Sequence, residues 1–137
     1  MNKSIVHIVT ASALFLSING LAMADTRYHT QASVNDSFGQ AGANVLQIRT
    51  SLRQIDREID FTDANAAAGI DALLNENESA LRDWQSRYPD DRRLPQLTYL
   101  LLDDYRKLAI VFPNDSLDAG DRAKSVFSWL EDLYPTI

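Results

Sequence analysis

Few residues in this chain are of the types that catalyse reactions. Cysteine is absent, and the two histidines are His7 and His29. His7 falls in a segment that we expect to be removed, and His29 falls in a polar stretch without helical or strand periodicity. Triad hydrolases and metal hydrolases need a firmly positioned imidazole, which such a stretch does not provide. We therefore predict no catalytic residues and no enzymatic activity.

Two pairs of adjacent acids are the remaining candidates for acid–base chemistry. They are Asp90-Asp91 and Asp103-Asp104. Neighbours on a helix point about 100° apart, so the two carboxylates of a pair do not share one site. There is also no glycine-rich phosphate loop. We expect no cofactor.

Three acids spaced by three residues are the weak candidate for a metal site. Asp115, Asp118 and Asp121 could converge at a helix end and hold calcium through oxygen atoms. They lack the order of acids and the closing glutamate of a calcium-binding hand. Acids in the first turn of a helix also favour its positive end without any metal. We therefore expect a helix start there and no metal.

Three arginines are spaced by four residues along one predicted helix. Arg49, Arg53 and Arg57 could form a basic row that binds an acidic partner or an anionic ligand. Alternatively, Asp56, Glu58 and Asp60 neutralise the row on a solvated face, with Arg53 paired to Asp56 and Arg57 to Asp60. We favour the neutralised face.

Two tryptophans complete the candidates for partner binding. Trp84 and Trp129 stand at helical spacing with other apolar residues, which favours a place in the core. A tryptophan exposed beside a groove would instead anchor a partner, because Trp, Tyr and Arg dominate binding energy.

The first 24 residues have the form of an export signal. Lys3 precedes an apolar stretch at residues 5–18, and Ala22-Met23-Ala24 places small side chains at both recognition positions of a signal peptidase. Spanning a bilayer takes about 20 apolar residues, so we expect cleavage after Ala24 and no stable membrane insertion. Without cysteine, the chain cannot become a bacterial lipoprotein. We expect a periplasmic protein or, alternatively, a secreted one.

The charge of the processed chain argues against nucleic acid as a partner. Removing the leader takes away Lys3 and no acid, which leaves twelve basic and nineteen acidic residues and a formal charge of −7. Nucleic acids and anionic lipids attract basic surfaces. We expect neither as a partner.

A single helical domain is predicted over residues 37–137, after a flexible lead-in at residues 25–36. Residues 37–40 have the form of a capping box. The apolar positions that follow alternate in spacing between three and four, which indicates a helix packing lengthwise against another. They are Phe38, Ala41, Val45, Ile48, Leu52, Ile55 and Ile59. Such a stripe could serve the protein's own core or a homodimer. The dimer would use Val45, Ile48, Leu52, Ile55 and Ile59.

Three further helices are predicted, each ended by a proline. The second helix covers residues 62–88 and could be one helix or two, because Asn77 interrupts its apolar stripe. The third lies between Pro95 and Pro113, and the fourth ends at Pro135. No segment shows the two-residue alternation of a half-buried strand. Short connections favour an all-α, up-and-down bundle of about four antiparallel helices.

Aromatic–proline pairs end three of these helices, at Tyr88-Pro89, Phe112-Pro113 and Tyr134-Pro135. Together with Trp129-Leu130, residues 112–135 resemble the second half of a tetratricopeptide unit as found in cell-envelope adapter proteins. The interval between stops is about two dozen residues rather than the 34 of that family, and its Trp-x-x-Leu-Gly-x-x-Tyr opening is missing. The resemblance implies, as an alternative fold, a short α-α repeat whose helix pairs expose a groove for a peptide or a partner helix.

Taken together, these features predict an exported, soluble helical module that binds another protein and has no catalytic role. The alternative is a ligand-binding bundle that holds a small apolar or cationic molecule between its helices. An apolar cavity beside Asn77 and inward-facing acids would favour that alternative.

Overall fold

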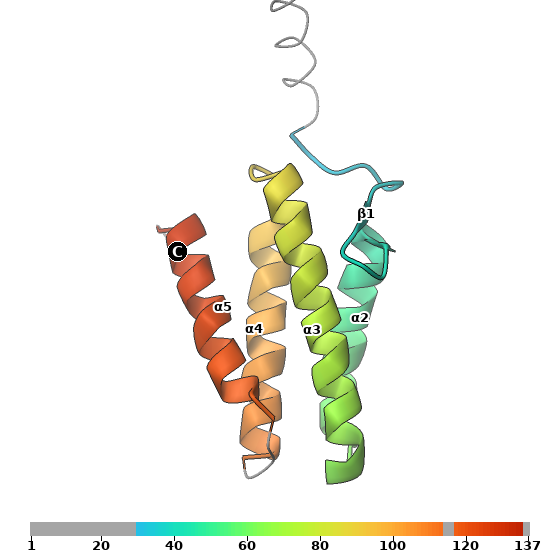
Figure 1. Cartoon of the computed structure of the whole chain (residues 1–137), viewed down its shortest axis with the longest axis vertical. Coiled ribbons are helices and arrows are strands. Elements are labelled where there is room, and N and C mark those ends of the chain that lie inside the picture. Colours follow the sequence, from blue (N-terminus) through green and yellow to red (C-terminus); the bar gives the residue numbers. More distant parts are fainter. Residues whose placement is uncertain (1–29, 114–116, 136–137) are drawn as a thin grey trace, which may run out of the picture.

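The computed structural model describes residues 30–113 and 117–135. The elements follow the order β1, β2, α2, α3, α4 and α5 (Figure 1). Their bounds are Ser37–Phe38, Ala43–Asn44, Val45–Ile59, Ala64–Arg87, Leu94–Val111 and Ala119–Leu133. The four helices pack against one another, so the prediction of an all-α bundle of about four helices is confirmed.

Helix α4 is central, because it packs against each of the other three helices. Helices α2 and α3 pack on each other and on α4, whereas α5 packs mainly on α4. Consecutive helices run antiparallel (Figure 1). As a result, α2 and α4 run in the same direction and begin at the same end of the molecule.

A short hairpin replaces the helix start predicted at residues 37–40. Strands β1 and β2 pair antiparallel, with Ser37 opposite Asn44. Gly39 and Gly42 adopt φ angles of 69° and 65°. Glycine tolerates these angles, but an α-helix cannot contain them. The two glycines therefore turn the chain back on itself before the helix begins.

Helix α2 starts at Val45, behind a capping box made from other residues. The Asn44 side chain accepts a hydrogen bond from the Gln47 amide at 2.9 Å, and the Gln47 side chain accepts one from the Asn44 amide at 2.8 Å. Both bonds satisfy N–H groups that a helix start leaves free. A capping box does start the helix, as predicted, but it is formed by Asn44 and Gln47 and not by residues 37–40.

The apolar stripe of α2 lies inside the bundle. Ile48, Leu52, Ile55 and Ile59 are each at most 1% exposed, and Val45 packs against them at the margin. Helices α3 and α4 cover this side of α2. In this fold the stripe serves the protein's own core, and a homodimer through it would require the bundle to open.

Helix α3 is one uninterrupted helix, so residues 62–88 do not form two. Asp63 caps its start through a side-chain hydrogen bond. The buried amide of Asn77 donates to the hydroxyl of Ser51 on α2 and to the carbonyl of Leu73, both at 2.8 Å. The polar interruption of the stripe is thus satisfied without a break in the helix.

Aromatic residues before proline end three helices in the same way. Tyr88, Phe112 and Tyr134 have ψ angles of 65°, 64° and 65°, while each backbone N–H still donates to the carbonyl four residues earlier. A following proline excludes the helical conformation for these residues. The predicted helix ends are confirmed. Within the tetratricopeptide-like stretch 112–135, residues 114–116 lie outside the described residues.

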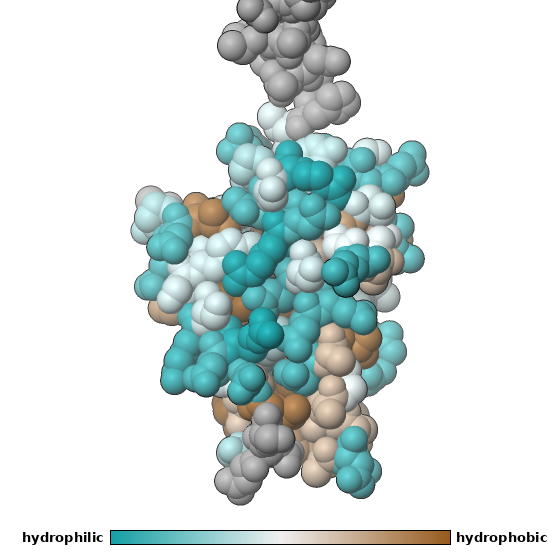
Figure 2. Space-filling view, in the orientation of Figure 1, coloured by the Kyte–Doolittle hydropathy of each residue, from teal (hydrophilic) through white to brown (hydrophobic). Residues whose placement is uncertain are grey.

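The surface is predominantly hydrophilic on the face shown in Figure 2, with separate apolar patches. Large exposed apolar side chains come from several elements. They are Val34, Leu46, Phe61, Leu73, Tyr99, Ile110, Val111 and Phe127. Among the helices of residues 30–113 and 117–135, none has the length and apolarity to cross a membrane.

Candidate functional site

The exposed side of α2 carries the predicted row of arginines. Arg49, Arg53 and Arg57 are all exposed, and successive members lie about 6 Å apart along the helix axis. None of the three guanidiniums forms an ion pair or a hydrogen bond with any described residue. Leu46, 68% exposed, lies one turn before Arg49. We call these four residues the α2 surface.

Two of the acids expected to neutralise this row, Asp56 and Asp60, bind a lysine of α4 instead. The Lys107 ammonium lies 2.9 Å from a carboxylate oxygen of Asp60 and 3.2 Å from one of Asp56. It also donates to the Asp56 carbonyl at 2.6 Å. The hydrogen bond to Asp60 is the main cause that raises the pKa of Lys107. The predicted pairs Arg53–Asp56 and Arg57–Asp60 are therefore wrong, and the row stays cationic.

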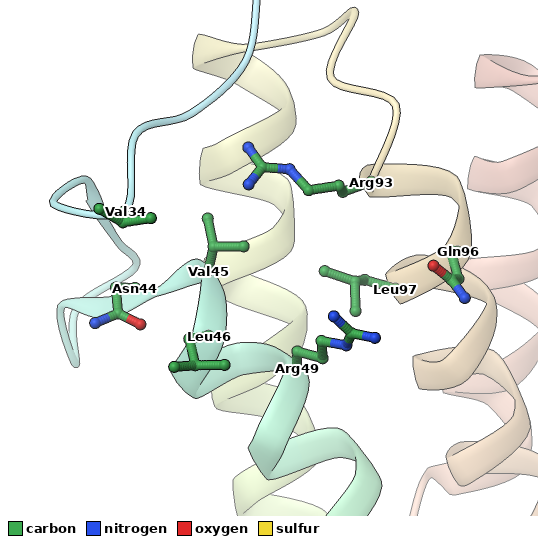
Figure 3. Close-up of a pocket in the computed structure, with 8 residues that line it drawn as sticks. All are labelled: Val34, Asn44, Val45, Leu46, Arg49, Arg93, Gln96 and Leu97. Atoms are coloured by element: carbon green, nitrogen blue, oxygen red, sulfur yellow. The ribbon is translucent and has the colours of Figure 1, made fainter.

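A pocket of about 340 Å³ adjoins the α2 surface. The first turns of α2 and α4 and the segment before β1 enclose it. The residues that line it are Val34, Asn44, Val45, Leu46, Arg49, Arg93, Gln96 and Leu97. Figure 3 shows Val45 and Leu97 lying between the side chains of Arg49 and Arg93. The pocket thus combines an apolar wall with two guanidinium groups from different elements.

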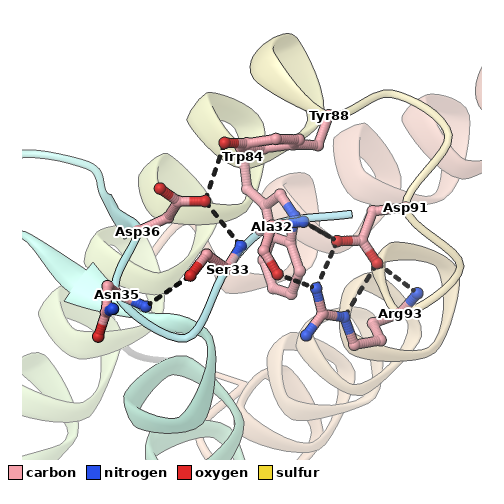
Figure 4. A network of polar contacts seen from close by, with 8 residues as sticks. All are labelled: Ala32, Ser33, Asn35, Asp36, Trp84, Tyr88, Asp91 and Arg93. Atoms are coloured by element: carbon pink, nitrogen blue, oxygen red, sulfur yellow. Dashed lines mark hydrogen bonds and ion pairs between the residues drawn. The ribbon is translucent and has the colours of Figure 1, made fainter. Parts of the chain in front are cut away.

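Asp91 fixes the position of Arg93 (Figure 4). Its buried carboxylate accepts hydrogen bonds from Nε and Nη2 of Arg93 at 3.0 and 2.7 Å. Burial raises the pKa of Asp91, but hydrogen bonds from the Arg93 side chain and from the backbone of Ala32 and Arg93 outweigh burial and lower it. The hydrogen bond to Asp91 raises the pKa of Arg93. Both groups therefore stay charged near neutral pH.

The same ion pair holds the segment before β1. The Ala32 amide donates to Asp91 at 2.9 Å, and Nη2 of Arg93 donates to the Ala32 carbonyl at 2.7 Å. These bonds hold the backbone of Ala32 in place, within the stretch for which the sequence predicts a flexible lead-in. They also bring Val34 to the rim of the pocket.

The two tryptophans differ in accessibility. Trp84 is completely buried, stacks on Phe38 with ring centroids 5.2 Å apart, and donates to Asp91 at 3.1 Å. It is a core residue and is not accessible as a partner anchor in this fold. Trp129 is half-buried beneath Arg82, whose guanidinium carbon lies 4.2 Å from the ring centroid. Because Trp129 projects from α5, the structure does not bring it together with the arginine row.

The acidic triplet does not assemble in the described part of the chain. Asp118 and Asp121 are exposed, and Asp121 lies 3.5 Å from Lys124 in an ion pair. Asp121 occupies the first turn of α5, where a negative charge is stabilised by the positive end of the helix. Asp115 lies outside the described residues, as does the segment 1–29 with the expected leader and His29. No three described His, Asp or Glu residues are grouped to hold a metal.

Glu78 is a buried acid of α3 with partners on three helices. Its carboxylate accepts from Nε of Arg82 and from the Tyr105 hydroxyl, both at 2.9 Å, and lies 3.6 Å from Arg122. Burial, followed by the charge of Glu78, raises the pKa of Tyr105. The carboxylate thus links α3 to α4 and α5.

Adjacent acids point apart, as predicted. Asp104 and Asp91 are buried, whereas Asp103 and Asp90 are exposed. One carboxylate oxygen of Asp104 has no hydrogen-bond partner among the described residues. Burial and then the charge of Asp56 raise the pKa of Asp104 to about 8. Neither sequence pair forms a two-carboxylate site.

No protein-family model, curated protein or solved structure matches the chain. Sequence reasoning identified the arginine row but missed the pocket, whose walls come from three separate segments. The available signal is Asp91 two residues before Arg93 at a helix start, but we considered Asp91 only as one of the adjacent acids Asp90-Asp91.

Proposed function

We propose that this protein is an exported, non-catalytic interaction module that binds an acidic surface of another protein through the α2 surface. The observation that carries the proposal is the row of three arginines without ion-pair partners among the described residues, beside the exposed Leu46. Export to the periplasm, or alternatively secretion, is proposed from the leader at residues 1–24.

Solvent-exposed ion pairs contribute only about 0.2–1 kcal/mol each, and salt screens them. Three such pairs need an apolar contact beside them to give stable binding, and Leu46 and Val34 are 68% and 75% exposed there. Charge complementarity contributes mainly to specificity and to the rate of association. We therefore expect binding that weakens steeply with ionic strength.

Affinity capture from the envelope fraction tests this proposal. The processed protein should retain a stoichiometric protein partner, and the combined change Arg49→Gln, Arg53→Gln and Arg57→Gln should release it. A matched control, Arg92→Gln, Arg106→Gln and Lys124→Gln, removes the same charge from other exposed positions. Equal loss from both sets, or no partner for the unmodified protein, would refute the proposal.

The alternative of a small molecule held between the helices has weaker support. Asn77 already bonds to Ser51 and Leu73, and Glu78, the buried acid next to it on α3, is paired with Arg82. These polar groups therefore have partners within the protein. A bound molecule released when the captured protein is denatured would transfer support to this alternative.

A further inference from the structure

The pocket beside the α2 surface has the composition of a site for an anion with an apolar body. Its apolar wall consists of Val34, Val45, Leu46 and Leu97. Arg49 and Arg93 each place a guanidinium beside this wall (Figure 3). Acidic residues are absent from its lining, and neither α2 nor α4 carries an acid in its first turn.

Both guanidiniums have N–H donors that bond to no described residue. Arg49 forms no bond to a described residue. Arg93 uses Nε and Nη2 for Asp91 and Ala32, while its Nη1 bonds to no residue of the described ranges. Because Asp91 neutralises Arg93, the net positive charge of the pocket comes from Arg49. Arg93 offers a fixed N–H edge in addition.

We propose that this pocket binds a carboxylate joined to a small apolar group, presented by the partner as an acidic residue next to an apolar one. The partner's being a protein rests on the proposed function. A planar guanidinium matches a carboxylate in a paired, two-bond geometry, which favours a carboxylate at Arg49. At about 340 Å³ the pocket is at the small end of the range for ligand sites, so it suits one side chain.

The orientation of the bound group in the pocket also determines which part of the partner lies along the arginine row. With the apolar group against Val45 and Leu97, the carboxylate meets Arg49. Arg53 and Arg57 follow along the axis at intervals of about 6 Å. The recognised segment therefore begins with the acidic–apolar pair and continues with further acids along the row.

Amide chemical-shift titration of the full processed chain tests the pocket directly. The probes are hexanoate and the capped dipeptide acetyl-Glu-Leu-amide, with hexylamine and acetyl-Gln-Leu-amide as charge controls. We expect hexanoate and the acidic dipeptide to shift the amides of Val45, Arg49 and Leu97 in a saturable way. We expect the two charge controls to leave them in place.

Two matched variants locate the binding. Arg49→Gln should weaken both acidic probes about fivefold or more, whereas Arg53→Gln, the same change one turn outside the pocket, should alter their affinity less than twofold. Val34→Ser should weaken hexanoate and leave the folded spectrum intact, because Val34 is largely exposed.

Any other result of these titrations contradicts one identifiable part of the proposal. Equal effects of Arg49→Gln and Arg53→Gln, or saturation by hexylamine, would refute carboxylate binding in the pocket. Binding of hexanoate without the acidic dipeptide would overturn a protein segment as the occupant and indicate a free carboxylate instead. Dipeptide binding together with failed capture of a partner would leave the pocket standing and refute the proposed function.

Discussion

The indole N–H of Trp84 donates a 3.1 Å hydrogen bond to a carboxylate oxygen of Asp91. The same oxygen accepts hydrogen bonds from the backbone amide of Ala32 and from Nη2 of Arg93. One buried carboxylate therefore joins the aromatic core of α3, the segment before β1 and the wall of the pocket (Figure 4). The binding surface and the stability of the domain are linked through it.

Asp91→Ala should lower the free energy of unfolding by about 3 kcal/mol. The change leaves the Ala32 amide and the Trp84 indole without their acceptor and Arg93 without its counter-charge. Partial exposure of Arg93, at 37%, keeps the loss from being larger. Urea denaturation measures it. Asp90→Ala, at the exposed neighbour, should change stability by less than about 0.5 kcal/mol, and equal losses would contradict this role.

Local chemistry predicted the helix ends but not the beginning of α2. Proline after Tyr88 and Phe112 acts on the adjacent residue, so the sequence alone locates those ends. The start at Val45 depends on Gly39 and Gly42 taking positive φ angles, which a capping-box pattern does not reveal. The sequence pattern predicts a helix that begins across these glycines, and they lie instead in the turn of a hairpin.

One part of the candidate site, the arginine row, was predictable from the sequence, and the other part, the pocket, was not. Spacing by four was enough to place the arginines on one side of α2. The pocket depends on contacts such as that between Ala32 and Asp91, 59 residues apart in the chain, which periodicity cannot predict. The ion pairs of Asp56 and Asp60 were missed because Lys107 belongs to a different helix.

Two glycines of the hairpin should respond differently to alanine. Both have positive φ angles, so both changes introduce backbone strain of about 1 kcal/mol or more. A Cβ on Gly39 would also lie 3.1 Å from the Cα of Ala80, whereas a Cβ on Gly42 meets nothing within 4 Å. Thermal unfolding should show a clearly larger loss for Gly39→Ala. Equal losses would show that the hairpin does not press on α3.

Two leucines of α2 separate core from surface. Leu52 is 1% exposed and Leu46 is 68% exposed. Leu52→Ala should cost about 3 kcal/mol through lost burial and a cavity, whereas Leu46→Ala should cost under about 0.5 kcal/mol. Guanidinium denaturation measures both. If Leu52→Ala left stability unchanged and instead dissociated a dimer in sedimentation, the stripe would be an interface.

Asp104 should make the domain less stable as the pH rises. Its pKa is about 8 in the folded state, against an ordinary value near 3.8, so the folded protein holds a proton that the unfolded chain releases. This contribution is fully present below pH 4 and is lost as the pH rises through 8. The charges that act on Asp104 are Asp56 on α2, and Lys107 and Asp103 on α4.

Asp104→Asn cannot ionise and should flatten the fall in stability between pH 5 and pH 8. Denaturant midpoints measured at each pH give the slope. Asp103→Asn removes the exposed neighbouring charge and should leave most of the slope in place. The lowered pKa of Asp91 acts at the acidic end, outside this interval. A slope that persists in Asp104→Asn would mean that Asp104 is not protonated in the folded state.

The most direct test of the central claim is site-specific photo-cross-linking in intact cells. A photoreactive residue replaces Thr50, which is exposed among the arginines of α2, and, in a matched variant, Ser128, which is exposed on α5. We predict a discrete cross-linked product with one protein from position 50, lost when Arg49, Arg53 and Arg57 are changed to glutamine. The same product from position 128, or none from position 50, would contradict binding through the α2 surface.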